Sequence, residues 1–331
     1  RPVSRGDFRS GRRDAIGGRA ADPDRSVRER SRHAVTDLMT RPDESLSASA
    51  APQTATRMIL TLSCTDTPGI VAAVASTLAN AGCNILESAQ YGDVETGLFF
   101  MRVMFAAAPG VLREDVAGAL APVAKRFRMD WGVHDAERRM PILVLVSKFD
   151  HCLIDLLYRR RVGALPADIR AVVSNHPDAE RIAAAEGIPF HHVPVTRDTK
   201  AAAEARLLEI IEETGAELTV LARYMQVLSE DLSKRLSGRI INIHHSFLPA
   251  FKGAKPYHQA HARGVKLIGA TAHYVTEDLD EGPIIEQDAE RVSHNHSAED
   301  LVAIGRDIEA RVLARAVGYH IERRVFLNGV K

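Results

Sequence analysis

Between residues 58 and 134, segments typical of strands and helices follow one another in a fixed order. Met58 to Cys64 is typical of a strand, and Pro68 with Gly69 opens a helix that we expect to run to about Gly82. Strands are expected at 84–91, 98–105 and 128–134, and a second helix at 111–125. The order β-α-β-β-α-β predicts a ferredoxin-like α+β domain with one sheet face covered by two helices.

A different rhythm begins at Pro141 and continues to the end of the chain. Apolar runs typical of strands alternate with helical stretches, which predicts a parallel, doubly wound, Rossmann-like α/β sheet. Strands are expected at 142–147, 169–174, 217–222, 239–243, 268–275 and 283–292, and helices at 151–161, 178–186, 200–213, 229–236 and 298–320. We therefore assign one domain to residues 56–136 and a second to residues 137–331.

The first 55 residues have another composition. They are rich in Arg, Asp, Ser, Ala and Pro, and residues 1–32 contain almost no large apolar side chain. Such a segment cannot bury enough apolar surface to offset its conformational entropy. We expect residues 1–55 to be a disordered, Arg-rich tail.

The charge and cysteine content limit the partners and the compartment. Lys plus Arg and Asp plus Glu both number 43, so the formal net charge is zero. This balance does not suggest nucleic acid or an anionic membrane as the main partner. The longest apolar runs, such as Pro141 to Val146, are too short to span a bilayer. Three cysteines without a CxxC pair favour a reducing cytoplasm over a disulfide framework.

The segment from Ile240 to Pro249 carries the strongest chemical signal. Because side chains alternate along a strand, Asn242 and His244 share one face, and Ile241 occupies the other. The expected strand ends in a loop at its carboxyl end, where open α/β sheets bind ligands. There an amide can donate to a developing oxyanion and an imidazole can move a proton. A buried, hydrogen-bonded Asn and His without catalytic function would give the same pattern.

The segment from Thr276 to Pro283 places four acidic residues between two expected strands. Such a cluster is usually a solvated turn. The functional alternative is that one carboxylate faces inward and works with His244.

Cofactor signals are missing at the expected positions. Residues Ser147 to Cys152 follow the first strand of the second domain and contain no glycine, which argues against a dinucleotide cofactor or a P-loop. The close histidine pairs lack the spacing of known zinc motifs. We predict neither a cofactor nor a metal.

Several long motifs resemble the formyltetrahydrofolate deformylase family. The similarity is carried by Asn242 to Ala260, Ile268 to Val275, Asp280 to Ile284 and Leu221 to Leu228. The first domain looks like an ACT domain whose opening turn is Asp66 to Val71. The resemblance extends from Met58 to the C-terminus and leaves the tail unexplained.

The resemblance implies a formyltransferase-type catalytic domain that hydrolyses 10-formyltetrahydrofolate to formate and tetrahydrofolate, balancing folate pools and supplying formate for purine biosynthesis. It implies a catalytic set in which Asp280 activates water, His244 shuttles protons, and Asn242 with protonated His244 stabilises the oxyanion. The implied substrate-binding residues lie in two segments: Arg223, Tyr224, Met225, Val227 and Leu228, and then Val275, Thr276, Glu277, Asp278 and Leu279.

For the ACT-like domain, the resemblance implies homo-oligomers, and two roles stay open. Either its open sheet face pairs with a neighbour and builds the oligomer, or it binds an amino acid such as glycine or methionine that controls the enzyme. The effector residues expected there are Asp66, Pro68, Gly69 and Asn84.

Two other functions stay open. A phosphoribosylglycinamide formyltransferase would share the catalytic set, but it would have a glycine-rich phosphate-binding turn where Ser147 to Cys152 stands. A catalytically inactive amino-acid sensor would not need Asn242, His244 and Asp280 intact.

Overall fold

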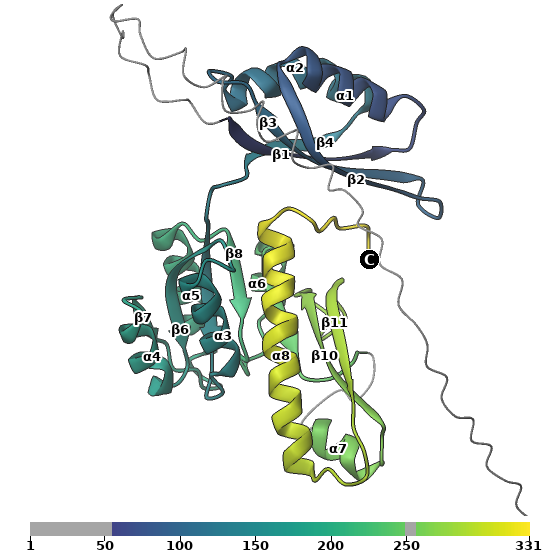
Figure 1. Cartoon of the computed structure of the whole chain (residues 1–331). Coiled ribbons are helices and arrows are strands. Elements are labelled where there is room, and N and C mark those ends of the chain that lie inside the picture. Colours follow the sequence, from purple (N-terminus) through teal and green to yellow (C-terminus); the bar gives the residue numbers. More distant parts are fainter. Residues whose placement is uncertain (1–54, 249–255) are drawn as a thin grey trace, which may run out of the picture. The chain divides into compact units, whose positions relative to one another are not determined.

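The computed structural model describes residues 55–248 and 256–331 (Figure 1). The predicted tail therefore lies outside the described residues, except for Ala55. Residues 249–255 of the Asn242 motif lie outside them as well.

The first domain has the predicted order of strands and helices. Its elements are β1 (Thr56–Thr65), α1 (Ile70–Asn80), β2 (Cys83–Asp93), β3 (Leu98–Ala107), α2 (Arg113–Phe127) and β4 (Asp130–Asp135). The strands form an antiparallel sheet in the order β2-β3-β1-β4. Leu60 and Leu62 of β1 are spaced to face the same side. They are buried in one core with Val74 and Leu78 of α1, which confirms the ferredoxin-like arrangement.

The second domain is built on a seven-stranded sheet in the order β11-β10-β9-β8-β5-β6-β7. Its strands are β5 (Met140–Val146), β6 (Ala167–Ser174), β7 (Phe190–His192), β8 (Leu218–Leu221), β9 (Ile240–His244), β10 (Leu267–Tyr274) and β11 (Ile284–Arg291). Its helices are α3 (His151–Arg161), α4 (Glu180–Ala185), α5 (Lys200–Thr214), α6 (Glu230–Arg235), α7 (Pro256–Ala262) and α8 (Ala298–Ile321). The short elements β7 and α7 were not predicted, because neither is long enough to show a clear periodicity.

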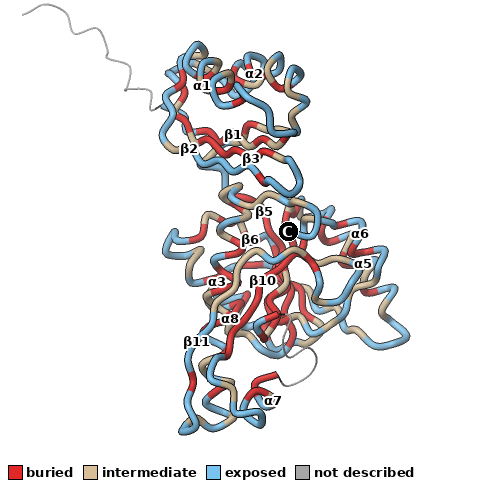
Figure 2. Tube along the Cα trace, turned by 90° about the vertical axis from the view of Figure 1, so that its right-hand side faces the viewer, coloured by how far each residue is buried: buried red, intermediate tan, exposed pale blue. Residues whose placement is uncertain are grey.

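Helices cover both faces of this sheet, as the doubly wound prediction requires. Side chains of α3, α4, α7 and α8 share one apolar core, whereas α5 and α6 belong to a second. All seven residues of β5 are buried, which fits a central strand enclosed on both sides. Figure 2 shows the buried positions concentrated along β5 and β10.

The sheet is mixed, and this corrects the expectation of a purely parallel one. Strands β5 to β9 pair in parallel, but β10 pairs antiparallel with both β9 and β11. The edge strand β11 contains no fully buried residue. An edge position with partly solvated side chains suits antiparallel pairing better than parallel pairing.

The strand order reverses direction at β5. The chain first runs from β5 to β6 and β7, and then returns to add β8 and β9 on the other side. Open α/β sheets bind ligands at the carboxyl ends of the strands beside such a reversal. Within the described ranges, no helix has both the length and the apolar character needed to cross a membrane.

Candidate active site

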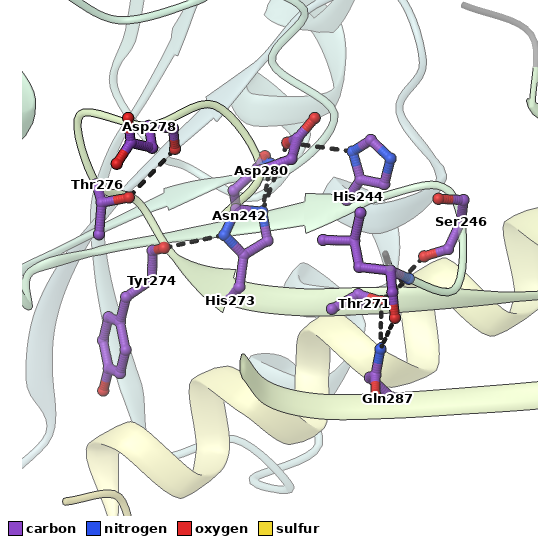
Figure 3. Close-up of polar contacts among 11 residues, drawn as sticks. Asn242, His244, Ser246, Thr271, His273, Tyr274, Thr276, Asp278, Asp280 and Gln287 are labelled. Carbon is purple, nitrogen blue, oxygen red and sulfur yellow. Dashed lines mark hydrogen bonds and ion pairs between the residues drawn. The ribbon is translucent and has the colours of Figure 1, made fainter. Parts of the chain in front are cut away.

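Strands β9 and β10 and the loop after β10 bring four polar side chains together (Figure 3). Nδ1 of His244 lies 3.2 Å from Oδ1 of Asp280. Asn242 Nδ2 lies 3.2 Å from His273 Nε2, and that nitrogen lies 3.7 Å from Asp280 Oδ1. The structure therefore unites the three residues proposed from the sequence and adds His273.

The register of β9 and β10 explains how His273 joins the site. His273 pairs directly with Asn242, and Thr271 pairs with His244. Directly opposed residues of antiparallel strands present their side chains on the same face. Alternation along a single strand could relate Asn242 to His244, but it could not show which strand lies beside them, so His273 was missed.

Thr271 also fixes the chain where it leaves β9. Its hydroxyl donates to the carbonyl of Ser246 at 2.9 Å and accepts from the Leu248 amide at 3.0 Å. Gln287 of β11 donates to the same hydroxyl at 2.9 Å. These hydrogen bonds hold the loop that follows His244.

The loop that carries Asp280 is tightly constrained. Asp280 has a φ of 57°, in the left-handed region that costs a non-glycine residue about 1 kcal/mol or more. A Cβ on the nearby Gly282 would lie 1.8 Å from the Tyr274 carbonyl oxygen, so only glycine fits. Residues held in such conformations often cluster at functional sites.

The surroundings of Asp280 favour its ionised form. Burial alone would raise the pKa of its carboxyl group, but hydrogen bonds and charges from His244 and His273 outweigh burial and hold the pKa below its usual range. Asp280 is therefore a carboxylate at neutral pH. His244 Nε2 is buried and has no hydrogen-bond partner among the described residues. Because Nδ1 faces Asp280, Nε2 is the atom left for a substrate.

A cavity of about 270 Å³ adjoins these residues. The loop after β8 supplies Arg223, Tyr224, Met225, Val227 and Leu228, and the loop after β10 supplies Val275, Thr276, Glu277, Asp278 and Leu279. All ten positions expected to bind substrate thus line the same cavity, and Gln226 and Ser233 are additional lining residues. More than half of Met225, Val227 and Leu279 is exposed, so the cavity presents apolar surface to a ligand.

Strand alternation by itself predicts that His245 points to the face opposite His244, and the structure differs from this. His245 lies beyond the end of β9, so alternation does not send its side chain to the far face. Its ring stacks on that of His244, with 5.2 Å between centroids and 22° between planes, and it lines the same cavity. Burial and the nearby charge of Arg223 lower the pKa of His245 to about 4, so this ring is neutral at pH 7.

Comparison with known proteins places this site in a family. The sequence model of the formyl transferase family matches residues 140–317, and that of the ACT domain matches residues 58–121. The chain is 52% identical over 275 residues to formyltetrahydrofolate deformylase of Corynebacterium sp. (strain P-1), covering 82% of this chain and 96% of that protein. The chain belongs to the formyltetrahydrofolate deformylase family.

Solved structures agree with this assignment. The formyltetrahydrofolate deformylase of Burkholderia mallei superposes with a TM-score of 0.80 at 55% identity, covering 83% of this chain and 98% of that one. Glycinamide ribonucleotide transformylase 1 of Symbiobacterium toebii superposes with a TM-score of 0.55 at 32% identity, covering 58% of this chain and 92% of that one. The deformylase structure thus accounts for both domains, whereas the transformylase accounts for little more than half of the chain.

The turn after β5 has a structural function in this protein. The hydroxyl of Ser147 accepts the amide of Met225 at 3.0 Å and donates to Oδ1 of Asn175 at 2.6 Å. The Ser147 amide donates to the carbonyl of Arg223 at 3.2 Å. The turn after β5 contains no glycine, and its Ser147 instead holds Arg223 and Met225, which line the cavity, in place.

One group among the described residues could bring metal ligands together. Donor atoms of His151, Cys152 and Glu309 lie within 4.8 Å of one another. Burial raises the pKa of the Cys152 thiol well above its usual value, and Glu309 already pairs with Arg223 at 3.2 Å. A protonated thiol and a neighbouring guanidinium both oppose a cation there.

The expected effector residues of the ACT domain do not form one group. Asp66, Pro68 and Gly69 are exposed and follow the carboxyl end of β1. Asn84 pairs with Ala106, which also pairs with Arg57 near the start of β1. The grouping with Asn84 was wrong, because β1 and β2 run in the same direction and the start of β2 lies at the opposite end of the sheet.

Proposed function

We propose that this enzyme hydrolyses 10-formyltetrahydrofolate to formate and tetrahydrofolate. The observation that carries this proposal is the joint placement of Asn242, His244 and Asp280 at a cavity with apolar lining, with His244 Nε2 buried and unpaired among the described residues. An amide donor can stabilise the oxyanion of formamide hydrolysis, an imidazole can transfer a proton, and a carboxylate can activate water.

In the proposed mechanism, Asp280 accepts a hydrogen bond from the attacking water and directs it to the formyl carbon. The Asn242 amide and protonated His244 donate hydrogen bonds to the oxyanion of the tetrahedral intermediate. As the C–N bond breaks, N10 takes a proton from His244. Asp280 takes the proton lost by the water and later releases it to solvent. His244 Nε2 takes up a proton from solvent, which restores the imidazolium. Formic acid then releases its own proton to solvent and leaves as formate.

The test is formate release by the purified enzyme from 10-formyltetrahydrofolate, without an amine acceptor, a nucleotide or an added metal. We expect turnover under these conditions, since we propose that the reaction needs no cofactor. Turnover that appears only with glycinamide ribonucleotide would favour the transferase. Folate binding without any turnover would favour an inactive sensor.

The ACT domain supports a proposal about control. We expect it to bind a small-molecule effector, for which glycine and methionine are our first candidates because both are linked to one-carbon metabolism. Gly69 has a φ of 95° and precedes α1, so the free N–H groups at the start of this helix are available to a carboxylate.

Assembly and compartment are also proposals. Strand β2 is an edge strand of the first sheet and exposes Leu86 and Tyr91, which favours a homo-oligomer formed along this edge. Cys64, Cys83 and Cys152 are free thiols, all buried, and this is consistent with a reducing cytoplasm.

A further inference from the structure

A buried carboxylate on α8 connects three segments beneath the active site. Glu309 is 1% exposed. The hydroxyl of Tyr257 donates to its Oε1 at 2.8 Å. Its Oε2 lies 2.9 Å from His151 Nε2 and 3.2 Å from Arg223 Nε. Burial acts to raise the pKa of this carboxyl group, but these partners outweigh burial and lower it, so Glu309 is ionised.

Burying a carboxylate in this way contributes little to stability. The desolvation penalty of a buried ion pair often exceeds its Coulombic gain, and an apolar replacement is frequently as stable. A buried polar network can instead hold side chains in one arrangement. Here Tyr257 and His151 form hydrogen bonds with Glu309, and Arg223 contributes an ion pair, although its Nε and Nη1 have no hydrogen-bond partner among the described residues. The partners of Glu309 lie at the start of α3, in the loop after β8, and in α7. Its contacts therefore hold these three segments in place.

The helix itself is adapted to receive Tyr257. A Cβ on Gly305 of α8 would lie 2.2 Å from Cζ of Tyr257 and 2.5 Å from its hydroxyl oxygen. Glycine inside a helix costs about 1 kcal/mol relative to alanine, so it usually has a packing reason. Here Gly305 lets the tyrosine ring lie against α8, where its hydroxyl reaches Glu309.

Ring contacts lead from Tyr257 to the catalytic histidine. The Tyr257 and His245 rings lie 6.4 Å apart at 53°, and His245 stacks on His244 at 5.2 Å. The contact between His244 Nδ1 and Asp280 fixes one edge of the catalytic ring. The stacked His245 ring lies against its face, where it can oppose a rotation of the His244 ring.

We infer that Glu309 is a positioning residue that acts through Tyr257 and His245 to keep Nε2 of His244 directed at the substrate. This inference rests on the proposed hydrolase function, because it assigns a purpose to the orientation of His244. Glu309 and Tyr257 do not contact the reacting atoms. Tyr257 does not line the substrate cavity either, so the effect of changing it should appear in turnover rather than in substrate binding.

The decisive variant is Tyr257→Phe, which keeps the ring and removes its hydrogen bond to Glu309. We expect kcat to fall about 10- to 100-fold with KM within about twofold of wild type, because small misplacements of a catalytic group have effects of this size. Gly305→Ala, which displaces the same ring, should also lower kcat while KM stays within about twofold of wild type. Glu309→Gln should lower kcat as well, but it also weakens the ion pair with Arg223, which lines the substrate cavity, so KM should rise in this variant.

Val317→Ala is the matched control. Val317 lies on α8, is fully buried, and is farther along the helix from the Tyr257 contact. The Val317→Ala variant should have a lower melting temperature and an unchanged kcat. A Tyr257→Phe enzyme with kcat within twofold of wild type would overturn the inference. Equal losses of kcat in Tyr257→Phe and Val317→Ala would overturn it as well, since they would show a general effect of weakened packing.

A crystal structure of Tyr257→Phe separates this inference from the proposed function. If wild-type enzyme released no formate, the proposed function would fail. The crystal structure would still test the positioning of His244. Rotated His245 and His244 rings in the variant would support it, and unchanged rings would contradict it.

Discussion

Oδ1 of Asp280 lies within reach of both His244 and His273, at 3.2 Å from Nδ1 of the first and 3.7 Å from Nε2 of the second. The carboxylate thus lies near two imidazoles that come from neighbouring strands, while Asp280 itself has a left-handed backbone conformation. This arrangement keeps the carboxylate ionised and directs it toward the cavity. The predictions below test what each partner contributes.

Asp280→Asn should lower kcat for formate release by about 100-fold or more, the scale of a lost general acid–base group. The amide keeps the size of the carboxylate but cannot accept a proton from water or neutralise a histidine cation. The melting temperature should change little, because the side chain lies at the cavity rather than in an apolar core. Near-normal kcat in this variant would remove Asp280 from the mechanism.

His244→Ala should likewise lower kcat by about 100-fold or more, whereas His245→Ala should have a smaller effect. His244 presents to the substrate an Nε2 that has no hydrogen-bond partner in residues 55–248 and 256–331, and His245 contacts the His244 ring by stacking. Steady-state kinetics of both variants, measured on the same substrate preparation, give the comparison. Equal losses would mean that His245 itself takes part in proton transfer.

The stability of the protein should fall as the pH is lowered from about 7 to 5. Burial and nearby arginine charges lower the pKa of His245 and of His320 from 6.5 to about 4. Between these values the unfolded chain binds protons that the folded chain excludes, so acid favours unfolding. The contribution of these histidines to the free energy of unfolding is fully present above pH 6.5 and is lost as the pH falls toward 4. Each histidine adds at most about 1.4 kcal/mol per pH unit within this window.

Urea unfolding at several pH values tests this dependence with His320→Asn. Nδ1 of His320 and the Tyr274 hydroxyl form a hydrogen bond of 2.6 Å, and the side chain of Asn can form a similar hydrogen bond. The variant should show a shallower loss of stability on acidification. The exposed His258→Asn should keep the wild-type slope. A slope unchanged in His320→Asn would show that His320 does not exclude its proton in the folded state.

Glycine and methionine should alter either the rate of deformylation or the melting temperature if the ACT domain is a sensor. An effector changes activity only by binding two states with different affinity, typically with a coupling of about 1 to 3 kcal/mol. Gly69→Leu should abolish the response while the oligomer stays intact. An added Cβ there meets no atom within 4 Å, so the substitution changes the turn rather than the packing. No response to any of the twenty amino acids would leave the domain a structural role only.

The sequence was sufficient wherever local patterns decide the outcome. The order of elements from β1 to β4 and the helix from His151 to Arg161 followed from periodicity, glycines and prolines. Alternation along β9 placed Asn242 and His244 on one face before any neighbour was known. The family resemblance then indicated Asp280 and the ten cavity residues, all of which line one cavity.

Tertiary structure alone decided the features that depend on which segments become neighbours. The register between β9 and β10 brings His273 to Asn242, and the common direction of β1 and β2 carries Asn84 away from Gly69. The fit of Tyr257 against Gly305 likewise joins α7 to a helix far along the chain, and Tyr257 also lies beside the ring of His245. A sequence pattern records what one segment prefers. It does not record strand partners or long-range packing, because these are selected by burial of the whole core.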